Sequence, residues 1–357
     1  MRLLPLLASL GLAACSPGEG SASPAEPAVP APRSGTAAAA LPSEARTFRD
    51  WIAVCDNGNA CFAFGRGVDG FGWIRVAMAP GADARPEVAA GRWPDEARKT
   101  GPFILTIDAA DYPMTFADND PDAATAPPAR ALEIVRVLAD GQTAGIGPEQ
   151  ALSLSGAAAA LLWIDERQGR VNTATALRRR GSLPASSVPA APPLPAVTAA
   201  PAVSQTGFGD ENQILPAALE AVPAVAACRA ETGDHWISKE VMSARLDAST
   251  ELWAVPCFMG AYNMGHDWYV TGPGGRDPRP ARLGSSSGEA AAGTINGGYS
   301  PETRTLTAFA KGRGIGDCGV ASTWTWTGRD FVLTSESEMS ECWGVPADYW
   351  PTTWRTR

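Results

Sequence analysis

The segment STWTWTGRDFVLTSES, residues 322–337, decides the fold class of this chain. Threonine and tryptophan alternate strictly in its first part, and successive side chains of a strand point to opposite faces of a sheet. Trp324 and Trp326 are therefore expected on one face of a strand. The Gly-Arg-Asp that follows is typical of a turn, and the Phe-Val-Leu-Thr after it is expected to form the second strand. The segment thus predicts a β-hairpin.

Further strand-like segments lie N-terminal to this hairpin. In the first half they are residues 51–56, 60–67, 72–79, 102–108 and 132–139, and in the second half residues 249–257, 266–272 and 304–312. Gly, Pro, Asn and Asp separate them, which is typical of strands joined by turns. Residues 172–179 are predicted to close the first half as its last strand.

One segment of the first half has helical spacing. In residues 152–168 small and aliphatic side chains recur with a period near that of an α-helix, Ser155 is the expected N-cap and Gly169 lies just past the end. A short helix-like run also covers residues 215–227. The expected fold is mainly β, with two small β-sheet or sandwich domains, one short helix in the first, and disulfides stapling both.

Composition predicts the domain boundaries. Residues 15–47 contain almost no large apolar side chains, so burial cannot offset the entropy of ordering them, and we expect a disordered tether. Residues 182–209 are too rich in proline for a helix or a central strand and are predicted to be a semi-rigid linker. An N-terminal β domain, residues 48–181, and a C-terminal β domain, residues 210–357, remain, each of ordinary domain size.

The N-terminus predicts export. Residues 1–14 have one basic residue and a short apolar run, which indicates a signal peptide. Leu12-Ala-Ala-Cys15 resembles the bacterial lipobox, so Cys15 is the expected lipidation site, and Ser16 after it is typical of delivery to the outer membrane. We expect an outer-membrane lipoprotein facing the periplasm, and the alternative is a soluble periplasmic protein with an ordinary signal peptide.

Six cysteines remain after Cys15, and an even number in an exported chain predicts disulfides. In the CDNGNAC loop, Asn59 in the left-handed conformation would place Cys55 opposite Cys61 across a hairpin. Three pairings remain open for the other four cysteines. We favour Cys228 with Cys257 and Cys318 with Cys342, because these are neighbours in the sequence.

The net charge of -9 argues against nucleic acid or an anionic membrane surface as a partner, so the only membrane contact expected is the lipid anchor. The basic run at residues 178–180 is too short to change this, and we expect it to end a strand in solvent. Gly314, Gly316 and Gly319 have the G-x-G-x-x-G spacing of a dinucleotide loop, but a strand rather than a helix is predicted after them. We therefore expect a glycine-rich turn and no cofactor.

Metal and nucleophile motifs are incomplete. His235 and His266 lack a second His or Cys at metal spacing. Asp118, Asp120 and Asp122 begin a calcium-loop pattern that fails, because Ala123 and Ala129 occupy the positions of its Gly and Glu. The GSSSG at residues 284–288 matches a nucleophile elbow but lacks the preceding buried strand and the following helix. No metal site or catalytic residue is predicted.

Aromatic side chains concentrate in the second half. Tryptophan on a β surface more often packs a core than binds a ligand, and the alternative is a stacking surface for glycan or a peptide groove. Arg313 and Asp317, which flank Cys318, are expected to form a turn-closing ion pair or, alternatively, a polar binding edge. The residues considered for a binding surface are Trp268, Trp324, Trp326, Trp343, Tyr262, Asn263, Arg313 and Asp317.

The chain resembles the bacterial exported proteins of domain-of-unknown-function family 1176, and its first half is also similar to the invasion-associated locus B family. KGRGIGDCG, residues 311–319, is the most specific part of the first resemblance. The other matching residues are Trp51, Cys55-Asp56-Asn57, Cys61, residues 155–170 with 175–177, Gly260-Ala-Tyr-Asn263, Trp326, Gly328, Phe331, Leu333 and Cys342-Trp-Gly344. The resemblance implies export and architecture but no reaction.

Together these features predict a non-enzymatic envelope lipoprotein whose second half binds a protein or glycan partner. One alternative is a hydrolase that acts on an envelope polymer through paired Asp or Glu side chains, which would need an open cleft holding two carboxylates. Another is a structural spacer whose tryptophans are all buried. The sequence leaves the partner, the oligomeric state and the orientation of the halves open.

Overall fold

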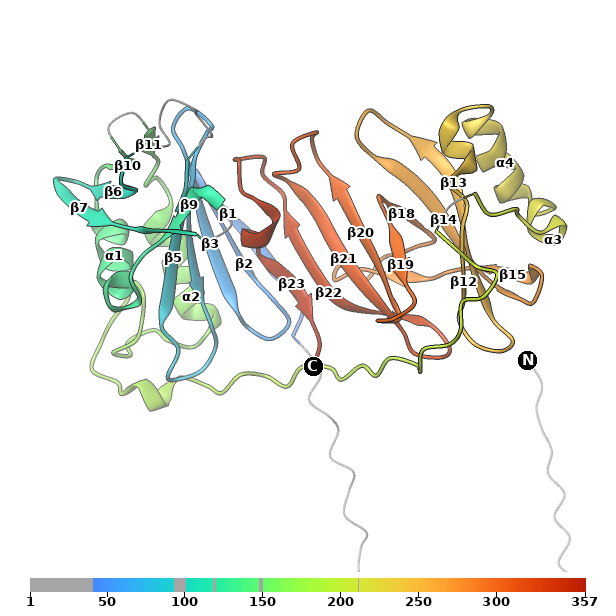
Figure 1. The fold of residues 1–357 in the computed structure, drawn as a ribbon. Helices are drawn as coiled ribbons and strands as arrows, with labels where there is room; N and C mark the ends of the chain where they lie inside the picture. Colours follow the sequence, from blue (N-terminus) through green and yellow to red (C-terminus); the bar gives the residue numbers. More distant parts are fainter. Residues whose placement is uncertain (1–40, 93–100, 118–119, 148–149, 211) are drawn as a thin grey trace, which may run out of the picture. The chain divides into compact units, whose positions relative to one another are not determined.

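The computed structural model describes residues 41–92, 101–117, 120–147, 150–210 and 212–357. The predicted signal peptide, Cys15, most of the tether and Asp118 lie outside the described residues. Residues 38–357 form one compact unit. Within it the chain is mainly β, as predicted, and strands from its first and second halves form separate antiparallel sheets (Figure 1).

A seven-stranded antiparallel sheet dominates the first half, in the order β1-β2-β3-β4-β5-β9-β8. Its strands are β1 (Glu44–Phe48), β2 (Trp51–Cys55), β3 (Cys61–Arg66), β4 (Trp73–Met78), β5 (Pro86–Gly91), β8 (Thr115–Ala117) and β9 (Asp120–Thr125). A four-stranded sheet contains β6 (Ile104–Ile107), β7 (Ala110–Pro113), β10 (Ala144–Ile146) and β11 (Gln150–Leu152). The first five strands of the large sheet are consecutive in the chain, so local hairpins build most of it.

The first half contains two helices rather than one, α1 (Pro128–Asp140) and α2 (Ala157–Arg167), which pack against β5 and β2 (Figure 1). The predicted strand at residues 132–139 is therefore wrong. Its buried residues, Ile134, Val135 and Leu138 with Ala131 before them, recur at helical spacing, and Pro128 stands at the start of the helix, where its missing N–H is tolerated. Burial against the sheet outweighs the strand preference of Ile and Val.

The second helix was expected but begins later than Ser155. Gly156 is its N-cap, with φ 111°, and a Cβ there would lie 1.7 Å from the carbonyl oxygen of Phe48. The close approach of β1 therefore requires glycine and sets the start of α2. At the other end Gly169 follows the helix with a positive φ of 67°.

The predicted last strand at residues 172–179 does not form. Instead, the buried carboxylate of Asp165 on α2 accepts hydrogen bonds from the backbone N–H groups of Leu177, Arg178 and Arg179, at 2.7, 2.8 and 3.0 Å. A carboxylate that binds three consecutive amides replaces the sheet partners of this segment. Burial raises the pKa of Asp165 against the opposing effect of these hydrogen bonds.

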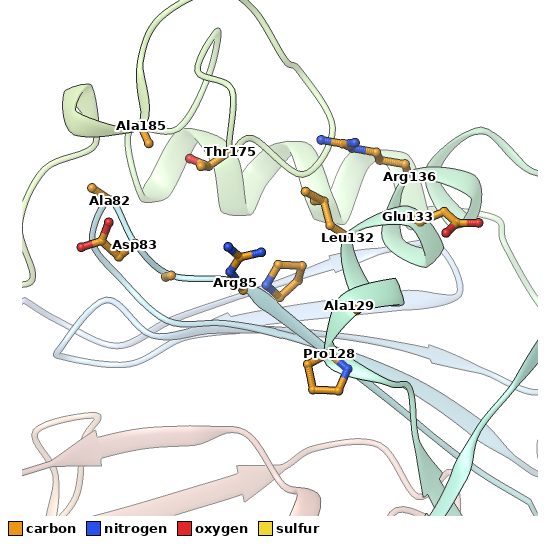
Figure 2. Close-up of a pocket in the computed structure, with 12 residues that line it drawn as sticks. Ala82, Asp83, Arg85, Pro128, Ala129, Leu132, Glu133, Arg136, Thr175 and Ala185 are labelled. Atoms are coloured by element: carbon orange, nitrogen blue, oxygen red, sulfur yellow. The ribbon is translucent and has the colours of Figure 1, made fainter.

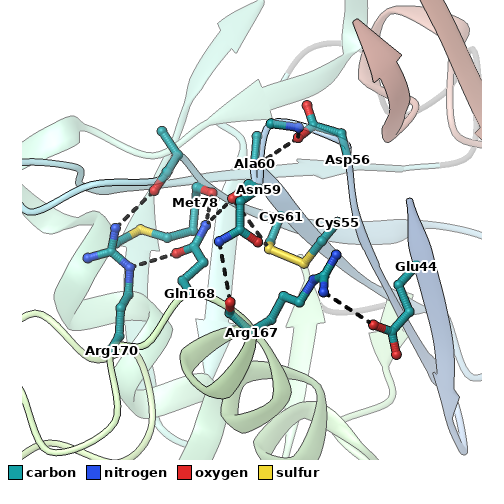
Figure 3. The surroundings of a disulfide bond; sticks show 12 residues. Glu44, Cys55, Asp56, Asn59, Ala60, Cys61, Met78, Arg167, Gln168 and Arg170 are labelled. Carbon is teal, nitrogen blue, oxygen red and sulfur yellow. Dashed lines mark hydrogen bonds and ion pairs between the residues drawn. A yellow bond between two sulfur atoms is a disulfide. The ribbon is translucent and has the colours of Figure 1, made fainter. Parts of the chain in front are cut away.

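The CDNGNAC hairpin forms as predicted (Figure 3). Cys55 pairs with Cys61 in register and through a disulfide, and Asn59 has φ 63°. Asp56 accepts from the N–H groups of Gly58 and Ala60, both at 2.8 Å. Gln168, just past α2, donates to the carbonyl of Asn59 at 2.8 Å, so the hairpin is tied to the helix.

The second half contains two five-stranded sheets and one short two-stranded sheet. The first sheet contains β12 (Met242–Arg245), β13 (Glu251–Met259), β14 (Met264–Gly272), β15 (Arg276–Pro280) and β18 (Gly293–Ile295). The second contains β19 (Gly298–Ser300), β20 (Thr305–Lys311), β21 (Gly319–Trp326), β22 (Phe331–Met339) and β23 (Thr352–Arg355), and β16 (Leu283–Gly284) pairs with β17 (Ala290–Ala291). The helices are α3 (Ala217–Glu220) and α4 (Pro223–Thr232), with 3-10 turns at Trp236–Lys239, Ala347–Tyr349 and, in the linker, Ala185–Ser187.

The predicted hairpin at residues 322–337 is confirmed as β21 and β22. Trp324 and Trp326 lie on one face and pack in a core with Trp268 from β14, Phe331 and Leu333. The other two disulfides, Cys228–Cys257 and Cys318–Cys342, are the pairings favoured from the sequence.

Side chains from both halves form a further apolar cluster, with Trp73 and Phe64 from the large sheet and Trp343 and Trp350 from the end of the chain. Arg355 of β23 forms an ion pair with buried Asp56, at 2.6 Å. The linker runs mostly without regular structure and is hydrogen-bonded to the second half, for example from the N–H of Ala200 to the carbonyl of Trp326 at 2.9 Å.

Candidate functional site

The four tryptophans considered for a binding groove are buried. Trp268 and Trp326 are 1% exposed, Trp324 6% and Trp343 8%. Two of the indole nitrogens are hydrogen-bonded inside the fold: Trp268 donates to Thr294 Oγ1 and Trp324 to the carbonyl of Gly284, both at 2.7 Å. An open groove lined by these tryptophans is therefore not formed, because Trp268, Trp324 and Trp326 fill the core between the two sheets of the second half and Trp343 packs in the cluster with Trp73 and Trp350.

The other four candidates come together at two neighbouring turns. Tyr262 and Asn263 belong to the turn between β13 and β14, and Arg313 and Asp317 to the turn between β20 and β21. Tyr262 Oη donates to the carbonyl of Gly312 at 3.3 Å, and Asn263 Nδ2 donates to the carbonyl of Lys311 at 2.9 Å. Hydrogen bonds thus join turns that are about fifty residues apart in the chain.

Asn296 connects these turns further and was not singled out from the sequence. Its Nδ2 donates to Asn263 Oδ1 and to the carbonyl of Phe309, both at 2.9 Å, and its Oδ1 accepts from the N–H of Met264 at 2.9 Å. Asn296 has a positive φ of 48°. The Asn-Gly-Gly at residues 296–298 was the available signal, since Asn before Gly is typical of turns.

Arg313 and Asp317 close the second turn. Arg313 Nε and Nη2 contact the two carboxylate oxygens of Asp317 at 2.6 and 2.5 Å, and Arg313 Nη2 also reaches the carbonyl of Cys342 at 3.1 Å. Asp317 accepts from the N–H of Gly344 at 2.7 Å. Burial alone would raise the pKa of Asp317, but the hydrogen bonds from Arg313 and Gly344 outweigh it and hold this pKa below its usual value.

Close packing explains why two positions of the KGRGIGDCG motif are glycine. A Cβ on Gly312 would lie 2.7 Å from the sulfur of Cys318, and Gly319, with φ 135°, approaches the carbonyl oxygen of Ala310 so closely that a Cβ would lie 2.0 Å away. The turn joins β20 directly to β21, and no helix follows the glycines. This is the glycine-rich turn expected from the sequence rather than the strand-to-helix context of a dinucleotide loop.

These two braced turns and the end of β13 carry exposed apolar side chains. Phe258 is 47% exposed, Met259 41%, Tyr262 42% and Ile315 62%, and we call these four residues the loop surface. The ring of Tyr262 lies against Gly314, where a Cβ would be 3.4 Å from Cδ1. Rigid turns therefore hold apolar groups in solvent, which is unusual unless they contact another molecule.

The histidines serve the fold in different ways. His235 Nδ1 caps the 3-10 turn at Trp236–Lys239 by accepting from the N–H of Ile237 at 3.4 Å. His266 is buried, and its Nε2 lies 3.2 Å from the carbonyl of Glu240. Burial lowers the pKa of His266 and raises that of the adjacent Asp267. Asp267 lies near Cys228 and Cys257, but their sulfurs are bonded to each other and are not thiolate ligands.

Acidic and serine candidates are also engaged in local structure. In the GSSSG segment, Ser286 donates its N–H to buried Glu336 at 3.2 Å, and β17 rather than a helix follows. Asp120 accepts from the N–H of Asp122 at 2.9 Å on β9. Asp108 and Asp111 both line a surface cavity of about 460 Å³, but Asp108 accepts from the amides of Gln142 and Thr143, and Asp111 accepts from Thr106 Oγ1.

Comparison with known proteins assigns the chain to a family without an established reaction. A protein from Escherichia coli (strain K12), uncharacterised and called YpfG, is 29% identical over 337 residues, which cover 87% of this chain and 93% of that protein. No solved structure matches. No helix in the described part of the chain is long and apolar enough to cross a membrane. The protein family of unknown function DUF1176 matches residues 45–357, and the chain belongs to this family.

Proposed function

We propose that the protein is a non-enzymatic lipoprotein of the bacterial envelope and that the loop surface docks a protein partner. The observation that carries this proposal is the exposure of Phe258 and Met259 at the end of β13 and of Tyr262 and Ile315 on turns that are already cross-braced. Exposed apolar side chains of this size are typical of interface centres.

The bracing supports binding because it lowers the entropic cost of association. The Cys318–Cys342 disulfide, the Arg313–Asp317 pair and the Asn263–Asn296 contact order the turns before any partner arrives. A partner would then lose little free energy to loop ordering.

A protein fits this surface better than a glycan. Glycan recognition by stacking would use the indole faces of Trp268, Trp324, Trp326 and Trp343, and these are buried. The side chains that remain in solvent include aliphatic Met259 and Ile315, which match an apolar protein surface.

The location of the binding site in the envelope rests on the N-terminus and the cysteines. The proposed signal peptide at residues 1–14 and lipidation at Cys15 would anchor the chain at the outer membrane, facing the periplasm. Three disulfides agree with an oxidising compartment. Labelling of growing cells with a radioactive fatty acid checks the anchor, because Cys15→Ser should abolish incorporation, and persistent labelling would contradict it.

Site-specific photo-crosslinking tests the docking surface. The full-length chain, with p-benzoylphenylalanine in place of Ile315, should give one discrete protein adduct in intact cells, and the second change Tyr262→Ser should remove it. Val332 on β22, which is 37% exposed, is the matched position for the control. The absence of an adduct at residue 315, or the same adduct at both positions, would contradict the proposal.

A further inference from the structure

A cavity of about 510 Å³ lies in the first half, between the segment before β5, one face of α1 and the residues after α2 (Figure 2). Arg85 and Arg136 are its cationic lining residues, and Thr175 contributes a hydroxyl. Its volume is in the range of small-molecule sites. It is separate from the loop surface, which belongs to the second half.

The two arginines lack partners within the described part of the chain. Arg136 on α1 is half-buried, and its Nε is shielded from solvent without a hydrogen-bond partner. Arg85 is exposed, and it too has no ion pair among the described residues. Figure 2 shows both guanidinium groups pointing into the space beside Thr175. Desolvation by burial lowers the pKa of Arg136, and the nearby positive charge of Arg180 lowers it further.

Three other arginines of the same half are paired with acidic side chains, unlike Arg85 and Arg136. Arg66 contacts Asp50 at 2.6 Å, Arg178 contacts Asp140 at 2.8 Å and Arg130 contacts Glu133 at 2.7 Å. These pairs show that acidic side chains are available in this half. Arg85 and Arg136 are therefore available to an anionic ligand, because they have no ion pair among the described residues.

The carboxylates that line the cavity are turned away from it. Glu133 is engaged by Arg130, and in Figure 2 its carboxylate points away from Arg85 and Arg136. The carboxylate of Asp83 also points away from the two guanidinium groups. The cavity therefore has a positive interior although the whole chain carries a net charge of -9.

The first turn of α1 adds to this positive interior. Pro128 and Ala129, its first two residues, line the cavity, the helix has no side-chain cap, and its first turn contains no acidic residue. The N-terminal end of the helix dipole is thus not neutralised by the protein, and such helix ends attract anions.

Buried Arg170 fixes the walls. It donates to the carbonyls of Ala79 and Gly81, at 2.9 and 2.7 Å, and to Thr175 Oγ1 at 3.1 Å. The segment that leads to Arg85 and the segment that carries Thr175 are therefore held on either side of the cavity before any ligand binds.

We propose that this cavity binds the phosphate group of a small molecule or of a lipid headgroup. Two guanidinium groups and a hydroxyl offer donors from several directions, and the N-terminus of α1 adds the positive end of its dipole, which together suit a tetrahedral oxyanion. The cavity admits a ligand of small-molecule size rather than a polynucleotide, consistent with the net negative charge of the chain.

Calorimetric titration of the full-length Cys15→Ser chain tests the proposal, since this change removes the lipid anchor from the measurement. One arm uses inorganic phosphate and glycerol 3-phosphate, and the other uses vesicles of phosphatidylcholine with and without phosphatidylglycerol. Arg85→Ala and Arg136→Ala should each weaken binding by about 10-fold or more, as expected for the loss of a charge-assisted hydrogen-bond donor. Arg329→Ala, at a side chain that is 92% exposed on a distant turn, is the matched control and should bind as the parent does.

The arms separate the sources of the phosphate. If the soluble phosphates bind and the arginine variants weaken that binding, the ligand is a free phosphate compound. If only the phosphatidylglycerol vesicles bind in this arginine-dependent way, the ligand is a lipid headgroup. Arg136→Lys retains charge in the half-buried site, so it distinguishes lost binding from lost folding, which thermal melts in chloride buffer also check. Binding that is absent in both arms, or that is unchanged in Arg85→Ala and Arg136→Ala, overturns the proposal.

Discussion

In the cavity of the first half the groups left for a ligand are charges, whereas on the loop surface of the second half they are apolar side chains. Arg85 and Arg136 have no acidic partner in the described residues, while Arg313 is locked to Asp317. Ile315, two residues from Arg313, is 62% exposed. Ordered segments of the same chain can therefore present either charged or apolar groups to a ligand. In each place, an available group is recognised because the side chains around it already have partners within the fold.

The disulfide turns show the same contrast. Cys55 and Cys61 are both fully buried, and their hairpin is bonded to residues after α2 (Figure 3). The turn next to Cys318 instead carries exposed Ile315. A disulfide that closes a buried hairpin stabilises the fold, and one beside an exposed turn also orders a surface.

The largest effect on the free energy of unfolding is expected from the buried arginine of the first half, Arg170. Arg170→Ala removes a fully buried cation with four polar contacts and should lower the free energy of unfolding by about 3–5 kcal/mol, because buried carbonyls and Asp165 lose their partner. Urea unfolding measures it. Arg85→Ala, in the same measurement, should stay within about 0.5 kcal/mol of the parent. A similar loss of unfolding free energy in both variants would show that Arg85 makes stabilising contacts within the fold.

Removal of the Cys318–Cys342 disulfide should have the next largest effect on the free energy of unfolding. In the chain-entropy account Cys318→Ser with Cys342→Ser, a separation of 24 residues, costs about 3 kcal/mol, and Cys55→Ser with Cys61→Ser, a separation of 6, about 2 kcal/mol. Hydrogen exchange should show lost protection in the turn between β20 and β21 for the first variant only. Unchanged protection there would mean that the hydrogen bonds alone order the turn.

The pH dependence of Asp317 gives a smaller effect. The pKa of Asp317 in the folded chain lies below its unfolded value, so its stabilisation is present above about pH 4 and is lost as the pH falls through the folded pKa. Asp317→Asn should therefore cost about 1–2 kcal/mol at neutral pH and progressively less in acid.

Asp267 provides the control for that measurement. Burial raises the pKa of Asp267, so its ionisation destabilises the fold as the pH rises through the folded pKa. Relative to the parent, Asp267→Asn should gain stability as the pH rises, the opposite trend to Asp317→Asn. Urea titrations at pH 3, 5 and 7 compare the two, with about 4 as the unfolded reference, and parallel trends would refute the assignment.

The smallest effect on stability belongs to the loop surface. Ile315→Ser should change the free energy of unfolding by less than about 0.5 kcal/mol, since the side chain is mostly in solvent. The same variant should lose partner capture when a crosslinker is placed at the neighbouring position Tyr262. A stability loss of about 2 kcal/mol would instead mean that Ile315 packs within the fold.

Most of the segments predicted as strands from local patterns do form strands, and two of them were misassigned. The alternation in β21 and the turn after it depend on neighbouring residues, and both were predictable. Residues 132–139 are rich in Ile and Val, so their helical burial in α1 was overlooked. Residues 172–179 lack sheet pairing because Asp165, earlier in the chain, binds their amides.

The candidate sites were less predictable than the fold. Tyr262 and Asn263 could be singled out by motif, but their contact with residues 311 and 312 depends on how two hairpins pack. Arg85 and Arg136 carried no sequence signal, because an arginine without a partner looks like any other arginine until its neighbours are placed.

The mainly β class, the β21–β22 hairpin and the Cys55–Cys61 disulfide follow from the sequence alone, because alternation and turn chemistry act between residues close in the chain. For the other four cysteines the sequence only favoured the pairing that the structure contains. The tertiary structure was needed to show that Trp324 and Trp326 are buried while Ile315 is exposed, and that Arg136 has no counterion among the described residues while Arg313 has one. Burial and charge pairing depend on contacts between distant segments, which packing alone brings together.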